Sequence, residues 1–438
     1  MIKKPRGTLD ILPEETEKWQ YIEQTIRSMS KLYGYGEIRL PTFEATELFA
    51  RGIGGTTDVV QKEMYTFTIK KDKEQDKDKD KDKNNEEQSL TLRPEGTANT
   101  MRSVIENSMY GGVLPLKLYY IMTCFRYEKP QAGRSREYYT FGIEQIGSAS
   151  PAADWEVISF ADALLKKLGI TDAELHINSI GCAAGGCRPN YHRILKDYLK
   201  NSYDDLCDTC KSRFERNPTR VLDCKSNICK NIVASAPKSK DYLCAECAEH
   251  FERVQNYLKA SEIDYSVNPL IVRGLDYYTK TVFEFISNNI GAQGTIAGGG
   301  RYDGLSELIG GPKLPGIGFG MGLTRLIMAV ENAGGYFPER EKPLIYIASL
   351  ADDKDKAREE ALSLAVKLRG DNIYAETDIM ERSLKSQMKY ADKIGAEYAY
   401  VIGGSEVEKR RAVLKNMRTS EQIECGFDEL TEILKAKN

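Results

Sequence analysis

The chain has 438 residues, of which 41% are hydrophobic, and a net charge of −3, so it is long enough for two or three domains with sizeable cores. A mean hydropathy of −0.47 and the lack of a long apolar run exclude a membrane-spanning protein, and the basic N-terminus has no apolar signal region. We therefore expect a cytoplasmic protein without a membrane partner. The net charge does not indicate whether the protein binds nucleic acid, because such binding depends on local clusters of Lys and Arg.

The N-terminal part of the chain gives helix and strand signals in turn. Residues 14–33 have the pattern of an amphipathic helix, with Pro13 and two acidic residues at its start and Gly34 at its end. Residues 37–68 hold short apolar and aromatic runs, which predict strands and turns. The charged run 70–88 has no apolar face to bury. We expect it to be the solvated tip of a hairpin from MYTFTI to SLTL rather than an interaction arm.

The central strands are predicted to be antiparallel. Residues 117–126 and 138–146 are rich in aromatic and β-branched residues and are separated by a charged loop, so we expect them to pair as a long hairpin. An amphipathic helix is predicted over 155–169. Strands and a glycine-rich turn follow at 265–311, and 316–332 has the pattern of a strand that runs into a helix.

The pattern changes after residue 343. Strand and helix signals alternate as β-α-β-α-β, with helices predicted over 351–369 and 382–394. This alternation is typical of an α/β domain with a largely parallel sheet. The predicted fold class is α+β, with an antiparallel sheet core, a cysteine-rich insertion and a C-terminal α/β domain. The predicted limits are 1–175 and 263–335 for the two parts of the core, 176–262 for the insertion and 342–438 for the C-terminal domain.

Eight of the ten cysteines lie between residues 182 and 247, which is too clustered for scattered core thiols. They form four pairs with two or four intervening residues, namely Cys182 and Cys187, Cys207 and Cys210, Cys224 and Cys229, and Cys244 and Cys247. Such spacings are typical of zinc ligands. They fit two four-cysteine sites, or one site and spare thiols, and the order along the chain does not say which pairs join. Redox-active dithiols and buried free cysteines are the alternatives.

Several segments carry arginines or carboxylates suited to an anionic or amino-acid ligand. Arg126 ends one predicted strand and Arg134 lies in the loop after it, and arginine offers permanently charged donors to phosphate and carboxylate oxygens. Glu95 in RPEGTA can bind an ammonium group. Arg325 lies in the first turn of a predicted helix, where the helix N-terminus also favours anions. Arg273 precedes two adjacent tyrosines, which would point to opposite faces of a strand.

Each of these segments also has a plainer interpretation, as a solvated hairpin, a turn or an exposed helix arginine. The glycine run 298–300 admits close approach of a ligand to the backbone, but we interpret the glycines alone as a plain turn. No GK[ST] follows them, so they are not a P-loop. The three histidines, His176, His192 and His250, lie in or beside the cysteine-rich stretch, which argues against a histidine base elsewhere.

Taken together and in this order, the segments resemble the class II aminoacyl-tRNA synthetases, and among them the histidyl-tRNA synthetase family. RLPTFEATELFARGIG resembles motif 1, YIMTCFRYE with YYTFGIE resembles motif 2, and GFGMGLTRL resembles motif 3. IVRGLDYYTKTVFE and AGGGRYDG resemble the two histidine-specific segments, and LTLRPEGTA the amino-group pocket. The resemblance covers nearly the whole chain. It implies ATP- and Mg²⁺-dependent activation of L-histidine, transfer to tRNA(His), and a homodimer with Pro41 at its interface.

The resemblance also implies roles for individual residues. Arg126 and Arg273 correspond to catalytic arginines at the α-phosphate. The residues implied in histidine binding are Glu95, Gly96, Thr97, Arg126, Thr140, Glu144, Arg273, Tyr277, Tyr278 and Tyr302. Those implied in ATP binding are Arg126, Glu128, Arg134, Tyr138 and Arg325. Thr140 stands where the family usually has a glutamine, and its shorter hydroxyl would reach the substrate through a water molecule.

The C-terminal domain is implied to read the anticodon. Its candidate RNA face consists of the basic residues Lys385, Lys389, Lys409, Arg410, Arg411, Lys415 and Arg418, with ordinary solvated surface as the alternative. Two other functions stay open. A synthetase-like regulatory subunit would bind histidine without charging tRNA, but the chain keeps its ATP-site arginines and its C-terminal domain. A ligase for proline, threonine or glycine is disfavoured by RGLDYY and Glu144.

Overall fold

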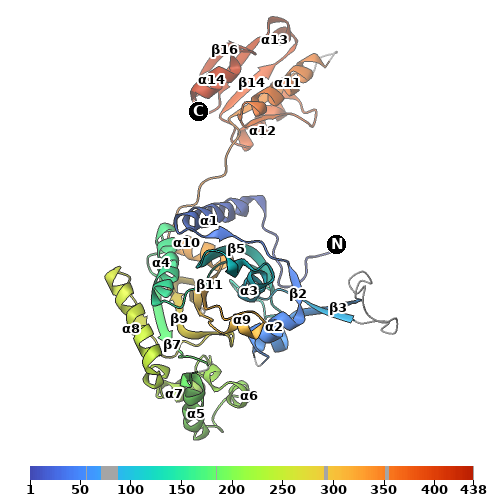
Figure 1. The fold of residues 1–438 in the computed structure, drawn as a ribbon. Coiled ribbons are helices and arrows are strands. Elements are labelled where there is room, and N and C mark those ends of the chain that lie inside the picture. The colour runs from blue at the N-terminus through green and yellow to red at the C-terminus, as the bar shows by residue number, and fades with distance from the viewer. Residues whose placement is uncertain (56, 71–86, 184, 291–293, 351–354, 438) are drawn as a thin grey trace, which may run out of the picture. The chain divides into compact units, whose positions relative to one another are not determined.

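The computed structural model describes residues 1–55, 57–70, 87–183, 185–290, 294–350 and 355–437. The chain divides into two compact units, Met1–Pro338 and Glu339–Asn438 (Figure 1). Within the described residues no helix is both long and apolar enough to cross a membrane. The predicted α+β class, with an antiparallel core and a C-terminal α/β domain, is confirmed.

An eight-stranded sheet forms the centre of the first unit. In spatial order its strands are β1 (Gly36–Glu37), β5 (Leu116–Phe125), β6 (Glu137–Ile146), β11 (Gly316–Gly322), β10 (Thr295–Arg301), β9 (Thr279–Ile286), β7 (Glu174–Ser179) and β8 (Ser266–Val267). Neighbouring strands are antiparallel except for the pairs at the two edges, β1 with β5 and β7 with β8. The predicted hairpin over 117–126 and 138–146 is confirmed as β5 and β6.

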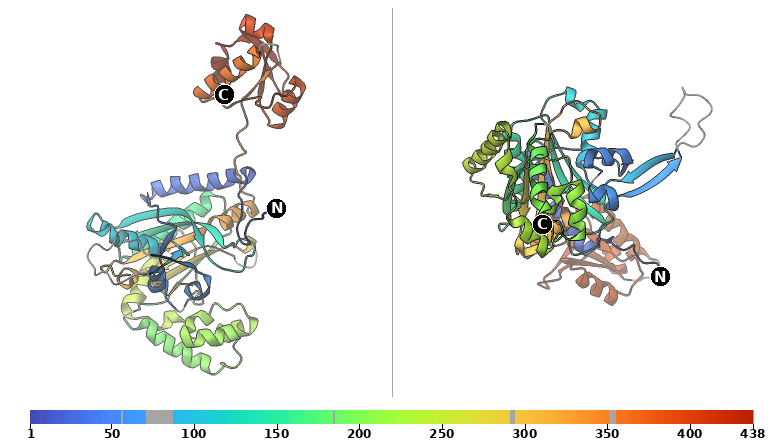
Figure 2. Two further views of the ribbon diagram at one scale, coloured as in Figure 1. Left: turned by 90° about the vertical axis from the view of Figure 1, so that its right-hand side faces the viewer. Right: turned by 90° about the horizontal axis from the view of Figure 1, so that it is seen from below.

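Four helices cover one face of this sheet. They are α1 (Pro13–Leu32), α4 (Pro151–Lys167), α8 (Ala245–Ala260) and α10 (Leu323–Asn332) (Figures 1 and 2). Apolar side chains from these helices and from the strands form one buried core, with members such as Ile22, Phe160, Phe141, Phe283 and Phe319. Burial of such side chains is the main force that holds the helices on the sheet.

The sequence explains where the first helices begin and end. Pro13 occupies the first turn of α1, where its missing N–H is not needed, and Gly34 follows the helix with φ +75°. The helix predicted over 155–169 is confirmed as α4, which starts earlier because Ser150 caps it, its hydroxyl accepting from the Ala152 N–H at 3.2 Å.

The prediction of strands and turns over 37–68 was wrong in part. Strands β2 (Phe43–Ala45) and β3 (Tyr65–Lys70) are present, but helix α2 (Thr46–Ile53) lies between them. The buried residues of this helix are Leu48, Phe49 and Ile53. In so short a segment, the spacing of apolar residues does not distinguish a helix from a strand. The predicted hairpin is confirmed as β3 and β4 (Glu87–Leu92), whereas 71–86, most of the predicted charged tip, lies outside the described residues.

The cysteine-rich stretch forms a helical module between β7 and β8. It contains α5 (Cys187–Lys200), α6 (Asp208–Arg216) and α7 (Asn227–Ala234), which gather together in Figure 1 and lead into α8. The module has an apolar core of its own, in which Leu195, Leu199, Val221 and Val233 are buried. The remaining elements of this unit are η1 (Val59–Glu63), α3 (Thr97–Glu106), η2 (Met109–Gly111), η3 (Pro218–Val221), η4 (Ser239–Tyr242), η5 (Asn288–Ile290) and α9 (Leu305–Leu308). The predicted limits of core and insertion stay predictions.

The second unit is a five-stranded sheet with helices. Its strand order is β13-β12-β14-β15-β16, and the first three strands are parallel. The elements are β12 (Ile345–Ser349), α11 (Lys356–Gly370), β13 (Ala375–Thr377), α12 (Leu384–Lys393), β14 (Tyr398–Ile402), α13 (Gly404–Lys409), β15 (Arg411–Asn416), β16 (Gln422–Gly426) and α14 (Leu430–Lys437). The predicted β-α-β-α-β order is confirmed, although residues 351–354 of the first predicted helix lie outside the described part. The antiparallel strands β15 and β16 were not predicted.

Candidate functional site

The candidate residues lie on the face of the large sheet opposite to the four helices. Alternate side chains of a strand point to opposite faces. On β6, Phe141 and Ile143 belong to the core under the helices, so Tyr138, Thr140 and Glu144 face the other way. One strand therefore brings three of the predicted site residues onto a single surface.

Glu144 is the acceptor of a buried group of hydroxyls. Its carboxylate accepts hydrogen bonds from the hydroxyls of Thr97 at 2.7 Å, Tyr120 at 3.0 Å and Tyr302 at 2.5 Å. Burial raises the pKa of Glu144 to about 8, and the neighbouring Glu95 carboxylate adds to the rise while the hydroxyls oppose it. A carboxylate has about four acceptor positions, so these three hydroxyls leave one position for a polar N–H of a ligand.

Glycines make room for this group of side chains. A Cβ at Gly142 would overlap the Tyr120 ring, and one at Gly318 would overlap the Glu144 carboxylate. Tyr120 was not identified from the sequence, although its hydroxyl donates to Glu144. The signal that identifies it is register, because Tyr120 pairs directly with Gly142 across β5 and β6.

The segment before α3 carries Glu95, a second buried carboxylate. Glu95 caps this helix by accepting from the backbone N–H groups of Thr97 at 2.6 Å and Ala98 at 2.9 Å, and Tyr277 donates to it at 3.4 Å. Burial raises the pKa of Glu95, and the two N–H groups oppose the rise. A carboxylate has about four acceptor positions, so the cap leaves capacity for an ammonium group. A side chain at Gly96 would overlap Tyr120.

Arg126 and Tyr138 lie at the loop end of the β5–β6 hairpin. Both donate to the same carbonyl, that of Pro94, from Arg126 Nε at 2.9 Å and from the Tyr138 hydroxyl at 2.7 Å. The guanidinium carbon of Arg126 lies 5.7 Å from the centre of the Tyr138 ring. The hairpin is thereby fixed to the segment that carries Glu95.

Arg273 enters the site from the loop before β9. Its guanidinium forms an ion pair with Glu284 on β9, a partner that was not identified from the sequence, and lies 5.7 Å from the centre of the Tyr278 ring. A Cβ at Gly298 would overlap this guanidinium. The interpretation of the glycine run as a plain turn was wrong. The glycines lie within β10, where they admit Arg273 and the adjacent strands.

Tyr277 and Tyr278 are both buried and pack against each other, with ring centres 4.7 Å apart. The expectation that they point to opposite faces of a strand was wrong. They lie in the turn before β9 begins at Thr279, where the alternation of a strand does not apply. Tyr277 also packs edge-on against Tyr302, with ring centres 5.9 Å apart.

Two further arginines lie beside the hairpin loop. Arg134 pairs with Glu128 at 3.1 Å. Arg325, at the start of α10, donates to the carbonyls of Gly133 at 3.2 Å and Thr295 at 2.9 Å. Burial lowers the pKa of Arg325, and the neighbouring Arg134 cation lowers it further. Two cations held this close together favour a polyanionic ligand.

Thr140 lies on the same face, between Tyr138 and Glu144. Its hydroxyl is 3.3 Å from the carbonyl oxygens of Phe141 and Met321. It pairs in register with Gly322, and a Cβ at Gly322 would meet no atom within 4 Å. The strand opposite therefore leaves space beside this short side chain.

The helical module contacts the loop that carries Arg273. Arg220 donates from Nη1 to the Arg273 carbonyl at 3.0 Å, and Asn217 donates to the Asp276 carboxylate at 2.9 Å. Arg188 donates to the Asp276 carbonyl at 3.0 Å. A cavity of about 260 Å³ lies at this junction, and its lining includes Arg188, His192, Asn217, Arg273 and Asp276. The junction was not predicted, because it joins segments far apart in the sequence.

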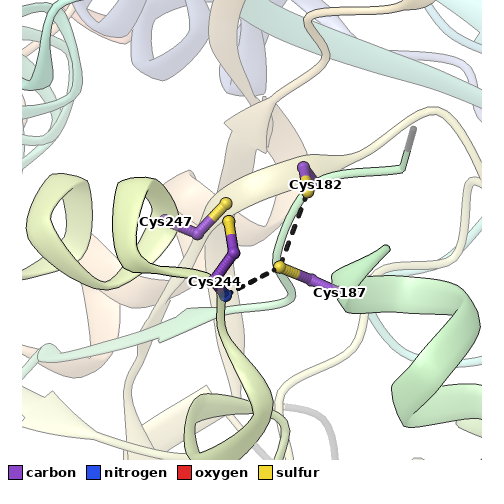
Figure 3. Close-up of side chains that lie close together, drawn as sticks. All are labelled: Cys182, Cys187, Cys244 and Cys247. Atoms are coloured by element: carbon purple, nitrogen blue, oxygen red, sulfur yellow. Dashed lines mark hydrogen bonds between the residues drawn. The ribbon is translucent and has the colours of Figure 1, made fainter. Parts of the chain in front are cut away.

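The eight clustered cysteines meet in two groups of four. One group is Cys182, Cys187, Cys244 and Cys247, and the other is Cys207, Cys210, Cys224 and Cys229. In each group the sulfur atoms all lie within 4.8 Å of one another (Figure 3 shows the first group). The pairing that the sequence left open is thus first pair with fourth, and second with third.

The basic residues of the second unit are partly engaged within that unit. Arg410 lies 3.5 Å from Asp428, and Arg411 lies 3.5 Å from Glu429. Lys385 and Lys389 are exposed on α12, one helical turn apart, so they lie on one face.

Known proteins match the chain along its length. A family model described as histidyl-tRNA synthetase matches residues 7–326, and one described as anticodon binding domain matches 344–437. The histidine–tRNA ligases of Caldanaerobacter subterraneus subsp. tengcongensis and Acetivibrio thermocellus are 51% and 52% identical over 435 residues, which cover 99% of this chain and 100% of each relative. The crystal structure of apo Staphylococcus aureus histidyl-tRNA synthetase matches with 38% identity and a TM-score of 0.79, covering 99% of this chain and 100% of that one.

Proposed function

The chain belongs to the histidyl-tRNA synthetase family, and from that premise we propose how its residues carry out the reaction. It is a histidine–tRNA ligase that activates L-histidine with ATP, releases pyrophosphate and transfers the histidine to tRNA. The identity of about half of all residues over full-length ligases disfavours a regulatory subunit and a ligase for another amino acid. The observation that supports the substrate best is Glu144, a buried acceptor among three hydroxyls.

We propose that the imidazole of histidine pairs with Glu144, with Tyr302 and Tyr278 beside it. The α-amino group binds to Glu95 and to the Thr97 hydroxyl, next to the backbone at Gly96. Support comes from the hydrogen bonds that join these groups, Thr97 to Glu144 at 2.7 Å and Tyr277 to Glu95 at 3.4 Å. Thr140 contacts the amino and carboxylate end through a water molecule, since its side chain is short.

The chemical step needs positioned cations rather than a base. The histidine carboxylate is already ionised at neutral pH, and its oxygen attacks the α-phosphorus of ATP. The bond to the β-phosphate oxygen breaks, and its electron pair leaves with pyrophosphate. We propose that Arg126 and Arg273 neutralise the charge at the α-phosphate, which is where positioning and electrostatics lower the barrier.

The remaining ATP contacts follow the hairpin. Tyr138 stacks on adenine, and Arg134 and Arg325 bind the outer phosphates beside Glu128. The proximity of the two arginines supports this, since burial and the Arg134 cation both lower the pKa of Arg325. Mg²⁺ bound with ATP supplies further charge neutralisation at the phosphates. In the second step the terminal ribose hydroxyl of tRNA(His) attacks the activated carbonyl, and AMP leaves.

We propose that the enzyme works as a cytoplasmic homodimer. Strands β2, β4 and β3 form a small three-stranded sheet, in the order β2-β4-β3. Its exposed Phe43 and Phe67 pack edge-on with ring centres 6.2 Å apart, which supports a partner surface there. Exposed apolar groups of this kind often mark protein interfaces. Pro41 lies close by in sequence and is exposed. On the second unit, the predicted basic residues, with Lys385 and Lys389 on one helix face, form the proposed RNA surface.

The decisive experiment is ATP–pyrophosphate exchange, measured for the wild type with each amino acid and for the Arg273→Ala variant with histidine. We expect exchange with histidine alone. Removing one preorganised cationic donor should lower exchange on the order of 100-fold or more while the fold persists.

The exposed Arg51 on α2 provides the matched control, Arg51→Ala, which should keep normal exchange. Circular dichroism verifies folding of both variants. No exchange with histidine would refute the assigned activity. Near-normal exchange in folded Arg273→Ala would remove Arg273 from the mechanism.

A further inference from the structure

The first group of thiols, called here the outer cluster, consists of Cys182, Cys187, Cys244 and Cys247. It lies where the helical module begins and ends (Figure 3). Cys182 follows β7, Cys187 is the first residue of α5, and Cys244 immediately precedes α8. The Cys182 and Cys187 sulfurs are 3.5 Å apart. A single tetrahedral ion with Zn–S bonds of about 2.3 Å needs sulfurs about 3.8 Å apart, so the observed spacing fits one ion.

The second group, called here the inner cluster, repeats this design inside the module. It consists of Cys207, Cys210, Cys224 and Cys229. Cys207 immediately precedes α6, as Cys244 precedes α8, and Cys210 lies in the first turn of α6. The Cys207 and Cys224 sulfurs are 3.8 Å apart. Each cluster therefore joins one pair with two intervening residues to one pair with four.

The backbone around both clusters favours ionised thiols. The N–H of Cys244 donates to the Cys187 sulfur at 3.0 Å, and the N–H of Cys207 donates to the Cys229 sulfur at 3.4 Å. Both CxxC pairs lie at the N-terminus of a helix, where the helix dipole stabilises negative charge. Donors that orient the ligands in this way are a regular feature of metal sites.

Glycines admit the sulfurs of the outer cluster. Gly181 has φ +72°, and a Cβ there would overlap the Cys187 side chain. A Cβ at Gly185 would lie 2.5 Å from the Cys182 sulfur. The chain thus avoids side chains at the two positions where they would displace a ligand.

The donor set selects the metal. Four thiolates suit zinc, whereas Mg²⁺ and Ca²⁺ take oxygen ligands. An iron–sulfur cluster would have to fit several iron and sulfide ions between the cysteines, but the sulfurs lie within 4.8 Å of one another. That space fits one ion. All eight cysteines are free thiols, so no disulfide competes for them.

We infer that the outer and inner clusters are two separate tetrathiolate zinc sites, nested one within the other. The outer site ties the entry of the helical module to its exit. The inner site holds α6 and α7 together around η3. Because the two sites share no ligand, loss of one leaves the ligands of the other intact.

Metal analysis of the full-length, fully reduced protein tests this inference. Mass spectrometry of the digested protein should find two zinc ions per chain. Cys247→Ser should retain one ion and Cys210→Ser should retain one, while the double variant retains none. Replacing zinc by Co²⁺ should give the thiolate-to-cobalt absorption of a four-sulfur site, with twice the intensity in the wild type as in either single variant.

The chain offers matched controls in Cys124 and Cys425, the two buried cysteines outside the clusters. Cys124→Ser and Cys425→Ser should keep both ions. If a cluster variant does not fold, titration of wild-type thiols with a mercurial should still release two zinc ions. Wild-type protein with fewer than two zinc ions, iron with sulfide in their place, or a folded single variant that loses both ions or neither would overturn the inference. The outcome is independent of the catalytic assignment, which metal content does not measure.

Discussion

At the scale of single residues, Glu144 is subject to two opposing effects. Pairing with an N–H favours the ionised carboxylate, whereas burial raises its pKa to about 8. In the free enzyme burial therefore favours the protonated form of this carboxyl group. Because the folded pKa lies above the usual value of 4.5, the folded state binds more protons than the unfolded one, and stability is lost as pH rises from about 4.5 through 8.

We expect Glu144→Gln to remove this loss of stability. Each pKa unit corresponds to about 1.4 kcal/mol. Between pH 5 and pH 9, the free energy of unfolding of the ligand-free variant should therefore rise relative to that of the wild type by on the order of 4 kcal/mol. Histidine-dependent exchange should disappear at the same time, because glutamine offers a weaker acceptor. Thermal unfolding followed by circular dichroism at both pH values measures the effect.

The matched control for this experiment is Glu106→Gln, which changes an exposed carboxylate at the end of α3. It should keep the wild-type dependence on pH. If Glu144→Gln loses stability with pH as steeply as the wild type, the raised pKa of Glu144 is refuted.

The sequence indicated which side chains share a face of one strand, but it did not indicate contacts that depend on a neighbouring strand. Glu144 and Thr140 were proposed from the sequence and share one face of β6 with Tyr138. Tyr120 was missed because its contact with Glu144 depends on its register with Gly142 on the neighbouring strand. Glu284 was missed for a similar reason, since its pairing with Arg273 depends on how the loop folds back onto β9.

At the scale of elements, the helical module contacts the loop that carries Arg273. Arg220, within η3, donates to the Arg273 carbonyl at 3.0 Å, while Glu284 forms an ion pair with the Arg273 side chain. Arg213 on α6 also pairs with Asp58, just before η1, at 3.1 Å. The module thus contacts the catalytic core on two sides, and η3 contacts the backbone of Arg273, for which a catalytic role is proposed.

Arg220→Ala should therefore slow catalysis, although the proposed mechanism gives Arg220 no contact with substrate. Small misplacements of a catalytic group have large effects on rate, so we expect kcat for exchange to fall between about 10- and 100-fold, with smaller changes in KM for histidine and ATP. Steady-state exchange kinetics give the two constants separately.

Arg193 on α5 is exposed in the same module, and Arg193→Ala should leave both constants unchanged. The zinc content of Arg220→Ala should equal that of the wild type, which separates positioning from collapse of the module. An unchanged kcat in Arg220→Ala would show that η3 does not position the loop.

Long periodic elements were predictable, and short or charged ones were not. Helix α1 and the β5–β6 hairpin are present as predicted, because each has one clear apolar face. Helix α2 was missed because eight residues give barely two turns of period. Strand β15 was missed because its sequence is basic, although Ala412 and Leu414 alternate inward and are buried.

At the scale of the whole molecule, the change of pattern near residue 343 indicated a second domain. Units Met1–Pro338 and Glu339–Asn438 are each compact, and separate family models match residues 7–326 and 344–437. The two apolar cores contain different strands and helices, so alternation of elements was a sufficient signal. Assembly was not predictable from such patterns, because it depends on what an exposed surface meets.

We expect the protein to sediment as a species of twice the chain mass of 49.3 kDa. Phe43→Glu places a charge in the exposed apolar group of the small sheet, which should shift the species toward a single chain and lower exchange with it. Analytical ultracentrifugation measures the mass of both proteins.

Val366 is an exposed apolar residue on α11 in the second unit, so Val366→Glu is the corresponding control and should leave the mass unchanged. A wild-type protein that sediments as one chain at micromolar concentration would contradict the homodimer. A Phe43→Glu variant with wild-type mass would place the interface elsewhere.

The position of the outer cluster bears on whether the inserted loop could be replaced by a shorter one. Strands β7 and β8 pair in parallel, and α8 connects them, so they form a strand–helix–strand crossover. Residues 180–244 are an enlarged first loop of that crossover, and the outer cluster brings its two ends together. A loop with adjoining ends can be exchanged for a shorter one without moving the strands it leaves. A related protein with a shorter loop here would lack the two zinc sites inferred above and would need another contact for the Arg273 carbonyl.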